Sequence, residues 1–270
     1  MEHTKKAASL AVLVALLAAA AACGDDDSTS SGSNADTTTT SAPDATAEPV
    51  IDPGDGGDYA PVLDPADFVD GVDNPYLPFV PGTTWHYEGT DDGEVEIDDV
   101  KVLDERKDVL GISAVVVQDT VKDADGNVLE DTLDWYAQDR DGNVWYLGEE
   151  TAEYENGKVT STKGSWEAGV DNAYAGIVMP ADPTAGHAYR QEYYAGEAED
   201  LGEILEVGAG PRTVPAGTYE DLVVTRDWNP LDPEVVEEKT YAPGIGMIYE
   251  VKVEGGEAEV ELVTTSATAS

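Results

Sequence analysis

The sequence predicts an all-β domain: an antiparallel curved sheet, half-barrel or sandwich that is built from hairpins and contains little helix. Short runs rich in Val, Ile, Tyr, Trp and Thr alternate with Gly, Asp and Asn clusters, at a spacing typical of hairpins. No long stretch keeps the helical period of about 3.6 residues. The chain also holds 13 Tyr and 5 Trp against 2 Phe, a balance that suits half-buried sheet positions.

The alternating runs give the expected strands and leave one helical candidate. That candidate is 197–206, and Gly202 weakens it. The strands are predicted at 83–88, 95–104, 112–121, 128–138, 144–154, 158–163, 188–195, 203–207, 221–228, 235–242, 247–253 and 258–264.

The hairpin turns have recognisable chemistry. Asn156-Gly157 suits a type I′ turn, because both central residues must accept positive φ. The pentad 123–127 recurs as 139–143, and each suits a type I turn closed by a left-handed Gly or Asn. Because oxygen-rich loops also bind calcium, the calcium candidates are Asp123, Asp125, Asp139 and Asp141. Both pentads lack the Asp order and final Glu of a calcium loop, so a structural role is the preferred interpretation.

The N-terminus has the plan of a signal peptide over residues 1–22. Lys5 and Lys6 precede an uncharged run that is shorter than the ~20 apolar residues of a permanent transmembrane helix. The sequence Ala20-Ala21-Ala22-Cys23 resembles a bacterial lipobox, whose cysteine carries two acyl chains and so anchors a protein stably. The motif lacks the usual Leu three residues before Cys23, which leaves soluble secretion to the medium open.

Three segments are expected after the signal peptide. Residues 23–64 form the lipidated cysteine and a disordered acidic Ser/Thr/Pro tether, since they hold too few apolar residues to fold. Residues 65–264 form a single β domain, and 265–270 a disordered tail. The domain is therefore predicted to be extracytoplasmic and held to the cell membrane by lipid on Cys23.

The charge balance narrows the possible partners. The chain has 14 Lys and Arg against 57 Asp and Glu, a net charge of −43. Nucleic acids and anionic lipid head groups need basic contacts that are scarce here, so nucleic-acid binding is not expected. Cations or salt are the compatible surroundings, and a solvated acidic shell is the preferred interpretation over a specific acidic site.

Catalytic motifs are missing from the sequence. His86 lies mid-strand and His187 precedes a strand, and neither belongs to a zinc-binding spacing such as HExxH. There is no GxSxG elbow, and carboxylate pairs are too numerous to be informative. We expect no catalytic residue, no cofactor and no metal beyond the weak calcium candidates, so an enzyme is not the favoured reading.

Aromatic pairs could form a binding surface. The pairs are Trp135-Tyr136, Trp145-Tyr146 and Tyr193-Tyr194. Because neighbouring strand residues face opposite sides, one ring of each pair is expected in the core and the other outside. An exposed row could stack on a polysaccharide, but cross-strand aromatic packing is the preferred interpretation.

Several motifs together resemble an uncharacterised family of exported bacterial lipoproteins. They are NPY at 74–76, PGTTW at 81–85, DWYAQD at 134–139, GNVWY at 142–146, GSWEAG at 164–169, MPA at 179–181, YRQEYY at 189–194 and YAPGIG at 241–246. The resemblance implies export and assigns no activity. By strand order, and by Pro-Ala-Gly-Thr at 215–218, the chain is also similar to half-barrel lipoproteins that carry acyl chains.

The favoured function is a membrane-anchored, non-catalytic binding or envelope module of unknown ligand. The alternatives are a carrier of a lipid or other apolar ligand in a half-barrel cavity, and then a secreted hydrolase. A cavity above ~300 Å³ lined by Leu, Val and Ile would support the carrier.

Replacing Cys23 with Ser should release the protein from the membrane to the medium without unfolding the domain, because the lipid is then lost. Immunoblotting of membrane and medium fractions checks this. A variant that stays with membranes after a high-salt wash would show that lipid on Cys23 is not the anchor.

Overall fold

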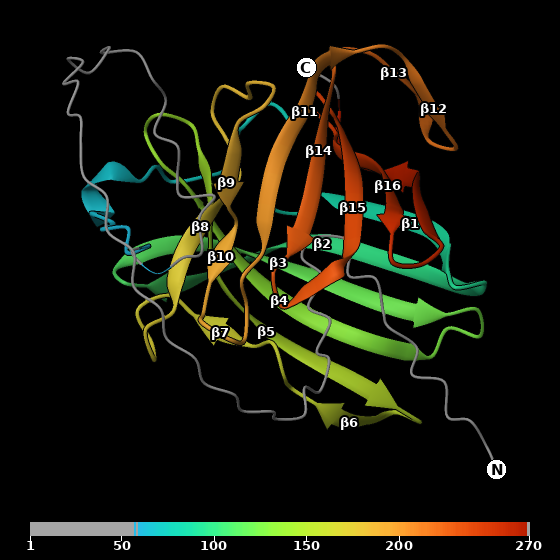
Figure 1. Cartoon of the computed structure of the whole chain (residues 1–270), viewed down its shortest axis with the longest axis horizontal. Helices are drawn as coiled ribbons and strands as arrows, with labels where there is room; N and C mark the ends of the chain where they lie inside the picture. The colour runs from blue at the N-terminus through green and yellow to red at the C-terminus, as the bar shows by residue number, and fades with distance from the viewer. Residues whose placement is uncertain (1–56, 58, 269–270) are drawn as a thin grey trace, which may run out of the picture.

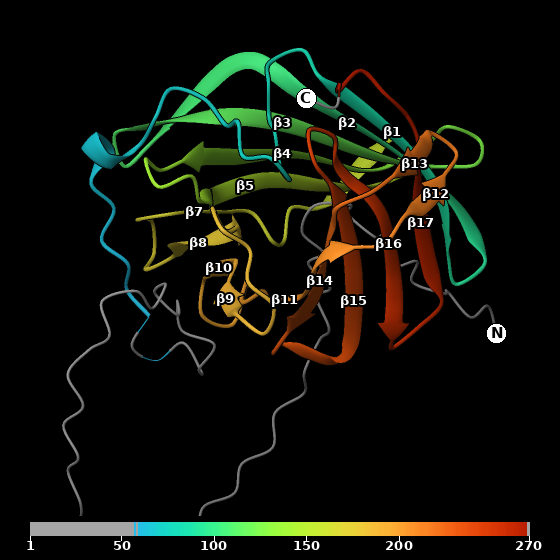
Figure 2. The same cartoon turned by 90° about the horizontal axis from the view of Figure 1, so that it is seen from above.

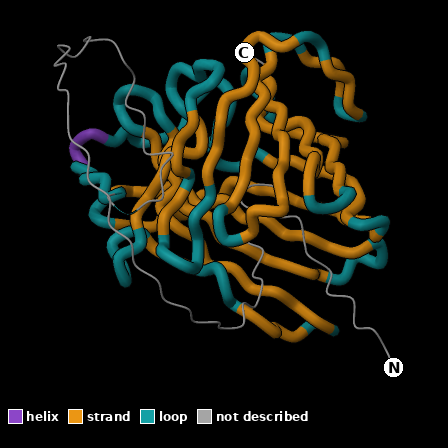
Figure 3. The backbone as a smooth tube through the Cα atoms, in the orientation of Figure 1, coloured by secondary structure: helices purple, strands orange, loops and turns teal. Residues whose placement is uncertain are grey.

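The computed structural model describes residue 57 and residues 59–268 of the 270-residue chain. The predicted signal peptide, Cys23 and most of the predicted tether lie outside the described residues. Within them nearly all regular structure is strand, and one short helical turn, η1 (Pro65–Asp67), is capped by the Asp64 side chain (Figure 3). The prediction of an all-β domain is confirmed.

The strands follow one another mostly as hairpins. The first eight are β1 (Thr84–Asp91), β2 (Glu94–Val109), β3 (Ile112–Asp123), β4 (Val128–Gln138), β5 (Val144–Glu155), β6 (Lys158–Ser161), β7 (Trp166–Glu167) and β8 (Tyr174–Met179). The others are β9 (Ala188–Arg190), β10 (Glu192–Tyr193), β11 (Leu201–Ala209), β12 (Arg212–Val214), β13 (Gly217–Tyr219), β14 (Leu222–Asn229), β15 (Asp232–Ala242), β16 (Gly246–Glu254) and β17 (Ala258–Thr265).

All strands except the β12–β13 hairpin belong to one antiparallel sheet, with β10 at one edge and β9 at the other. Its order is β10-β8-β5-β4-β3-β2-β1-β17-β16-β15-β14-β11-β9, with β6 and β7 also paired to β5. We call β2–β5 the first wall and β14–β16 the second wall; they face each other because the sheet is rolled (Figures 1 and 2). The expected curved sheet is thus present, nearly closed on itself.

One kinked segment closes the roll. β9 pairs with β11 and β10 pairs with β8, so the chain changes partner at Gln191 and joins the two edges. We call this junction of the two edges the seam. The backbone of Gly176 on β8 lies so close that an added Cβ would be 2.3 Å from the carbonyl oxygen of Arg190. On the other edge, a Cβ at Gly202 would be 2.8 Å from the ring of Tyr189. Glycine is therefore required where the edges meet.

Some sequence predictions are corrected here. The expected strand 188–195 is two strands with different partners, and the helical candidate 197–206 is wrong because its residues from 201 onward belong to β11. The strands β7, β8, β12 and β13 were not predicted. The ordered domain also exceeds its expected limits: Tyr59 is buried and donates a hydrogen bond to the carbonyl of Ala175, and Ser266 bonds to the backbone of Thr84.

The predicted turns are confirmed in their backbone conformation. Asn156 and Gly157 have φ of 53° and 71°, as a type I′ turn requires. Gly126 and Gly142 close the two Asp-rich pentads with φ of 80° and 101°.

The aromatic pairs differ from expectation. Both rings are buried in Trp135-Tyr136 and in Trp145-Tyr146, and both are half-buried in Tyr193-Tyr194. On the outer face the Lys107 ammonium lies 4.4 Å from the Trp135 ring centroid, and Phe68 packs edge-on against Trp145. The two rings of each of these pairs do face opposite sides of the sheet, but the predicted exposure of the outer ring is wrong, and the pairs present no exposed row of rings for a polysaccharide.

Gly176→Ala should destabilise the domain by about 2–4 kcal/mol, because the new methyl group would overlap backbone atoms that cannot move aside. Gly210→Ala is the control, since nothing lies within 4 Å of a Cβ there. Urea unfolding checks both variants. Equal stability of the two would show that the seam tolerates displacement.

Candidate functional site

The interior of the rolled sheet has an apolar layer and a charged layer. Along β4 the inward-facing residues pass from Tyr136 to Asp134 and Glu130, and along β16 they pass from Ile248 to Glu250. The same change occurs on β2, β3, β5, β14 and β15. In the first wall, from β2 to β4, the position at which the inward-facing residues turn from apolar to acidic moves by two residues from each strand to the next. Because strands of a rolled sheet tilt against its axis, this shift keeps the charged residues at one level.

Buried carboxyl groups outnumber buried cations in the described residues. Ten Asp and Glu residues are buried, against the three cations Arg190, Lys239 and Lys252. The ten are Glu96, Asp98, Asp119, Asp134, Glu149, Glu192, Asp200, Asp227, Glu237 and Glu250. A buried charge is costly unless it is paired, so such groups hold protons or require a counter-charge.

The excess of acid lies on the first wall, in four residues that we call the carboxylate row: Asp98, Asp119, Asp134 and Glu149. They come from the neighbouring strands β2, β3, β4 and β5, and none is more than 3% exposed. None of them takes part in an ion pair within residues 59–268. Burial first, and neighbouring carboxylates second, raise the pKa of Asp98, Asp134 and Glu149 well above the usual range.

Asp98 and Asp119 form a carboxyl pair at one end of the row. The two groups hydrogen-bond to each other, and the pKa of Asp98 is raised more strongly by burial and by the Asp119 charge. Asp98 therefore holds the proton and donates it to Asp119. No other group in the described structure donates to their four oxygen atoms.

At the other end of the row, phenol groups meet Asp134 and Glu149. The Tyr146 hydroxyl lies 2.6 Å from Oδ1 of Asp134 and 3.0 Å from Oε2 of Glu149, so it donates between them. Tyr136 stacks on Tyr146 with 4.9 Å between ring centroids. The Tyr136 hydroxyl is fully buried and has no hydrogen-bond partner among the described residues, and burial followed by Asp134 and Glu149 raises its pKa. It thus offers an unused donor and acceptor beside these carboxylates.

The second wall differs because its acids have cations among them. The Lys239 ammonium lies 3.1 Å from Asp227, and the Lys252 ammonium lies 3.3 Å from Asp91. Lys239 also lowers the pKa of Glu237 and Glu250, although burial still raises both. The second wall is partly neutralised by its own residues.

A second carboxyl pair lies near the seam. Glu192 on β10 hydrogen-bonds to Asp200, just before β11. Burial raises the pKa of Asp200 to about 7 and that of Glu192 further, so Glu192 is the donor. One shared proton therefore links the two edges of the sheet.

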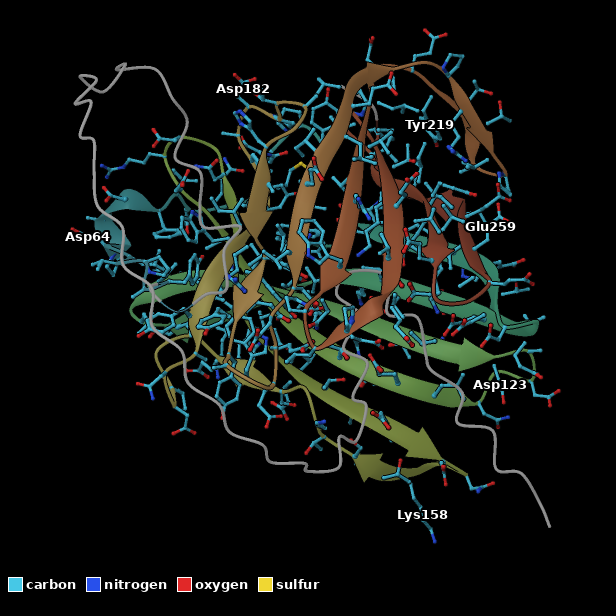
Figure 4. The ribbon with its side chains drawn as sticks, viewed as in Figure 1. Asp64, Asp123, Lys158, Asp182, Tyr219 and Glu259 are labelled. Atoms are coloured by element: carbon cyan, nitrogen blue, oxygen red, sulfur yellow. The ribbon has the colours of Figure 1, made fainter. Side chains whose placement is uncertain are left out.

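The calcium candidates lie in the hairpin turns, away from this interior; Asp123 marks the outer end of β3 in Figure 4. One oxygen of Asp123 accepts from the amides of Asp125 and Asn127, and the other accepts from the Asn127 side chain. In the second turn, one oxygen of Asp139 accepts from the amides of Gly142 and Asn143, and the other accepts from the Asn143 side chain. No group of three or more Asp, Glu, His or Cys side chains in the described residues is arranged to hold a metal ion. Calcium binding at Asp123, Asp125, Asp139 or Asp141 stays a prediction.

The two histidines of the described residues stand apart from the charged interior. His86 faces outward beside Asp99 at 2.7 Å, and the hydrogen bond with Asp99 raises its pKa. His187 is exposed in the segment before β9.

A small apolar pocket lies in the other layer. Its volume is about 10 Å³, and it is lined by Leu77, Pro78, Phe79, Trp85, Tyr87, Val100, Tyr241, Gly246 and Met247. That is room for about one water molecule. This pocket is far too small for an acyl chain.

Sequence reasoning missed the carboxylate row because it treated the acids as a solvated shell. The sequence did hold one usable signal. Alternate residues of a strand lie on the same face, so the polar Asp134 and Thr132 are expected on the same buried face as Tyr136. The register between strands, which brings these residues together, is not visible in any single strand.

Comparisons with known proteins give only a distant likeness. No protein-family model matches the chain, and no curated protein sequence matches it. One similar crystal structure is a protein assigned as exported, with a YmcC-like fold, from Bacteroides fragilis; it is 16% identical with a TM-score of 0.42, over 71% of this chain and 98% of that one. Another, assigned as a lipoprotein of Parabacteroides distasonis, is 14% identical with a TM-score of 0.39, over 73% of this chain and its own full length (100%). These values carry no information about ligand or activity.

Stability should rise when the pH falls from about 8 to about 5.5. Burial raises the pKa of Glu130, beside the row, from 4.5 to about 7. The folded state then binds a proton that the unfolded chain releases, so this stabilisation is complete below the unfolded pKa and is lost as pH rises through 7. One such group contributes at most about 3 kcal/mol.

Melting temperature measured against pH checks this, with Glu130→Gln expected to flatten the curve and exposed Asp125→Asn expected to leave it unchanged. A melting temperature that is constant, or that rises toward pH 8, would contradict it.

Proposed function

We propose that this protein is a lipid-anchored, extracytoplasmic binding module that holds a cationic ligand inside the rolled sheet. The observation that carries the proposal is the carboxylate row, whose four buried acids have no counter-charge in the described structure. An ammonium or similar cation would supply that charge and would donate hydrogen bonds to the carboxylates. The Tyr136 hydroxyl provides a further polar contact at the same place.

The anchoring part of the proposal rests on the lipobox-like sequence that ends at Cys23. Among the residues that the structure describes, no helix is long and apolar enough to cross a bilayer. Lipid on Cys23 would place the domain outside the membrane at the end of its acidic tether.

Two alternatives fit the interior less well. A carrier of acyl chains would need a large apolar cavity, whereas the apolar pocket described here has about 10 Å³. A hydrolase would need two carboxyl groups free to act on its substrate. The Tyr146 hydroxyl already lies between Asp134 and Glu149.

The test is calorimetric titration of the purified full-length protein with calcium chloride, guanidinium chloride, butylamine and spermidine. We expect saturable binding of at least one cation at neutral pH. Glu149→Gln should weaken it about 10-fold or more, because a charged hydrogen bond contributes about 1.5–3 kcal/mol.

Glu150→Gln is the matched control, since Glu150 is the next residue of β5 and faces outward. Absence of binding by every cation, or equal loss in both variants, would refute an interior site. Loss confined to Asp125→Asn or Asp141→Asn would place the cation in the turns instead.

A further inference from the structure

We infer that the cation held by the carboxylate row is a linear di- or polyamine, bound lengthwise across the first wall. This inference rests on the proposed function and goes beyond it in naming the class of ligand. Three features of the row support it: its extended shape, its two separate acidic ends, and the phenol groups at one of those ends.

The row is extended because it crosses the strands diagonally. Asp119 faces Thr132 of β4, and Asp134 lies two residues further along the same strand. With a rise of ~3.4 Å per residue and ~4.8 Å between strands, the Cα atoms of Asp119 and Asp134 are roughly 8 Å apart. One compact cation cannot contact the whole row, whereas ammonium groups joined by several methylene groups can.

The two ends of the row are separate acidic sites of different chemistry. At one end, Asp98 and Asp119 share a proton. At the other end, Asp134 and Glu149 are joined by Tyr146, with the free Tyr136 hydroxyl beside them. An ammonium group has three donors, which suits two carboxylates and one phenol oxygen.

A metal ion and a guanidinium ion fit these features less well. A metal requires several ligands around one point, and no such group of side chains exists in the described residues. A guanidinium ion is planar and suits one bidentate carboxylate, so it would leave the other end of the row without a partner.

The experiment compares spermidine, 1,4-diaminobutane and butylamine by titration calorimetry on the full-length protein. Spermidine should bind at least roughly 10-fold more tightly than butylamine, because it places ammonium groups at both ends of the row. Asp119→Asn should weaken spermidine about 10-fold and leave butylamine unchanged, because Asp119 carries the charge of its pair and a single ammonium group takes the end with the phenols. Asp134→Asn should weaken both ligands.

The variants remove a buried charge without changing side-chain size, so folding is preserved, and Glu150→Gln serves as the matched control. Equal affinity for spermidine and butylamine, or loss of both in Asp119→Asn, would overturn the polyamine inference and leave an interior cation site in place. Binding of calcium or guanidinium alone would likewise overturn the polyamine inference and leave the interior cation site in place. If none of these cations binds, both the polyamine inference and the proposed function are refuted.

Discussion

The fold is governed by the burial of ten carboxyl groups with only three cations among the buried residues. In a low-dielectric interior a lone carboxylate is so unfavourable that it takes up a proton or finds a partner. The protein uses both solutions. Asp98 and Glu192 hold protons that they share with Asp119 and Asp200, while Lys239 pairs with Asp227. The interior consequently holds many carboxyl groups, and their total charge depends on pH and on any cation that enters.

Closure of the sheet and the charged layer depend on each other. Glu192 and Asp200 lie on either side of the seam, and the proton that they share joins edges that otherwise have only short ladders of two or three residue pairs. Gly176 allows the backbone at Gln191 to pass close enough for this contact. Deprotonation of the pair would place two like charges at the least strongly paired part of the sheet, so the seam is where the roll is most sensitive to high pH.

Periodicity predicted the hairpins well where turn residues separated the runs, as at Asn156-Gly157. It failed at β8, whose residues lie in a Gly-rich stretch without alternation, and at 188–195, where only tertiary contacts show the change of partner at Gln191. The same limit applies to the candidate site. Each strand shows acids at its inward positions, but a sequence with 57 Asp and Glu gives no reason to single them out. Register alone aligns Asp134 with Glu149 and sets Asp98 beside Asp119.

Stability does not explain why the carboxylate row is acidic. The same positions on β2–β5 alternate with outward residues in a regular pattern, so Val or Thr at Asp98, Asp119 and Asp134 would satisfy the sheet equally well. Replacing buried ionic groups by apolar residues of similar volume is often neutral or stabilising, by up to about 4 kcal/mol. The second wall at least recovers part of that cost through Lys239 and Lys252, whereas the carboxylate row takes part in no ion pair in the described structure. A fold that concentrates uncompensated acid on one face of its interior, beside an unpaired phenol, is organised for a cation that the chain does not itself supply.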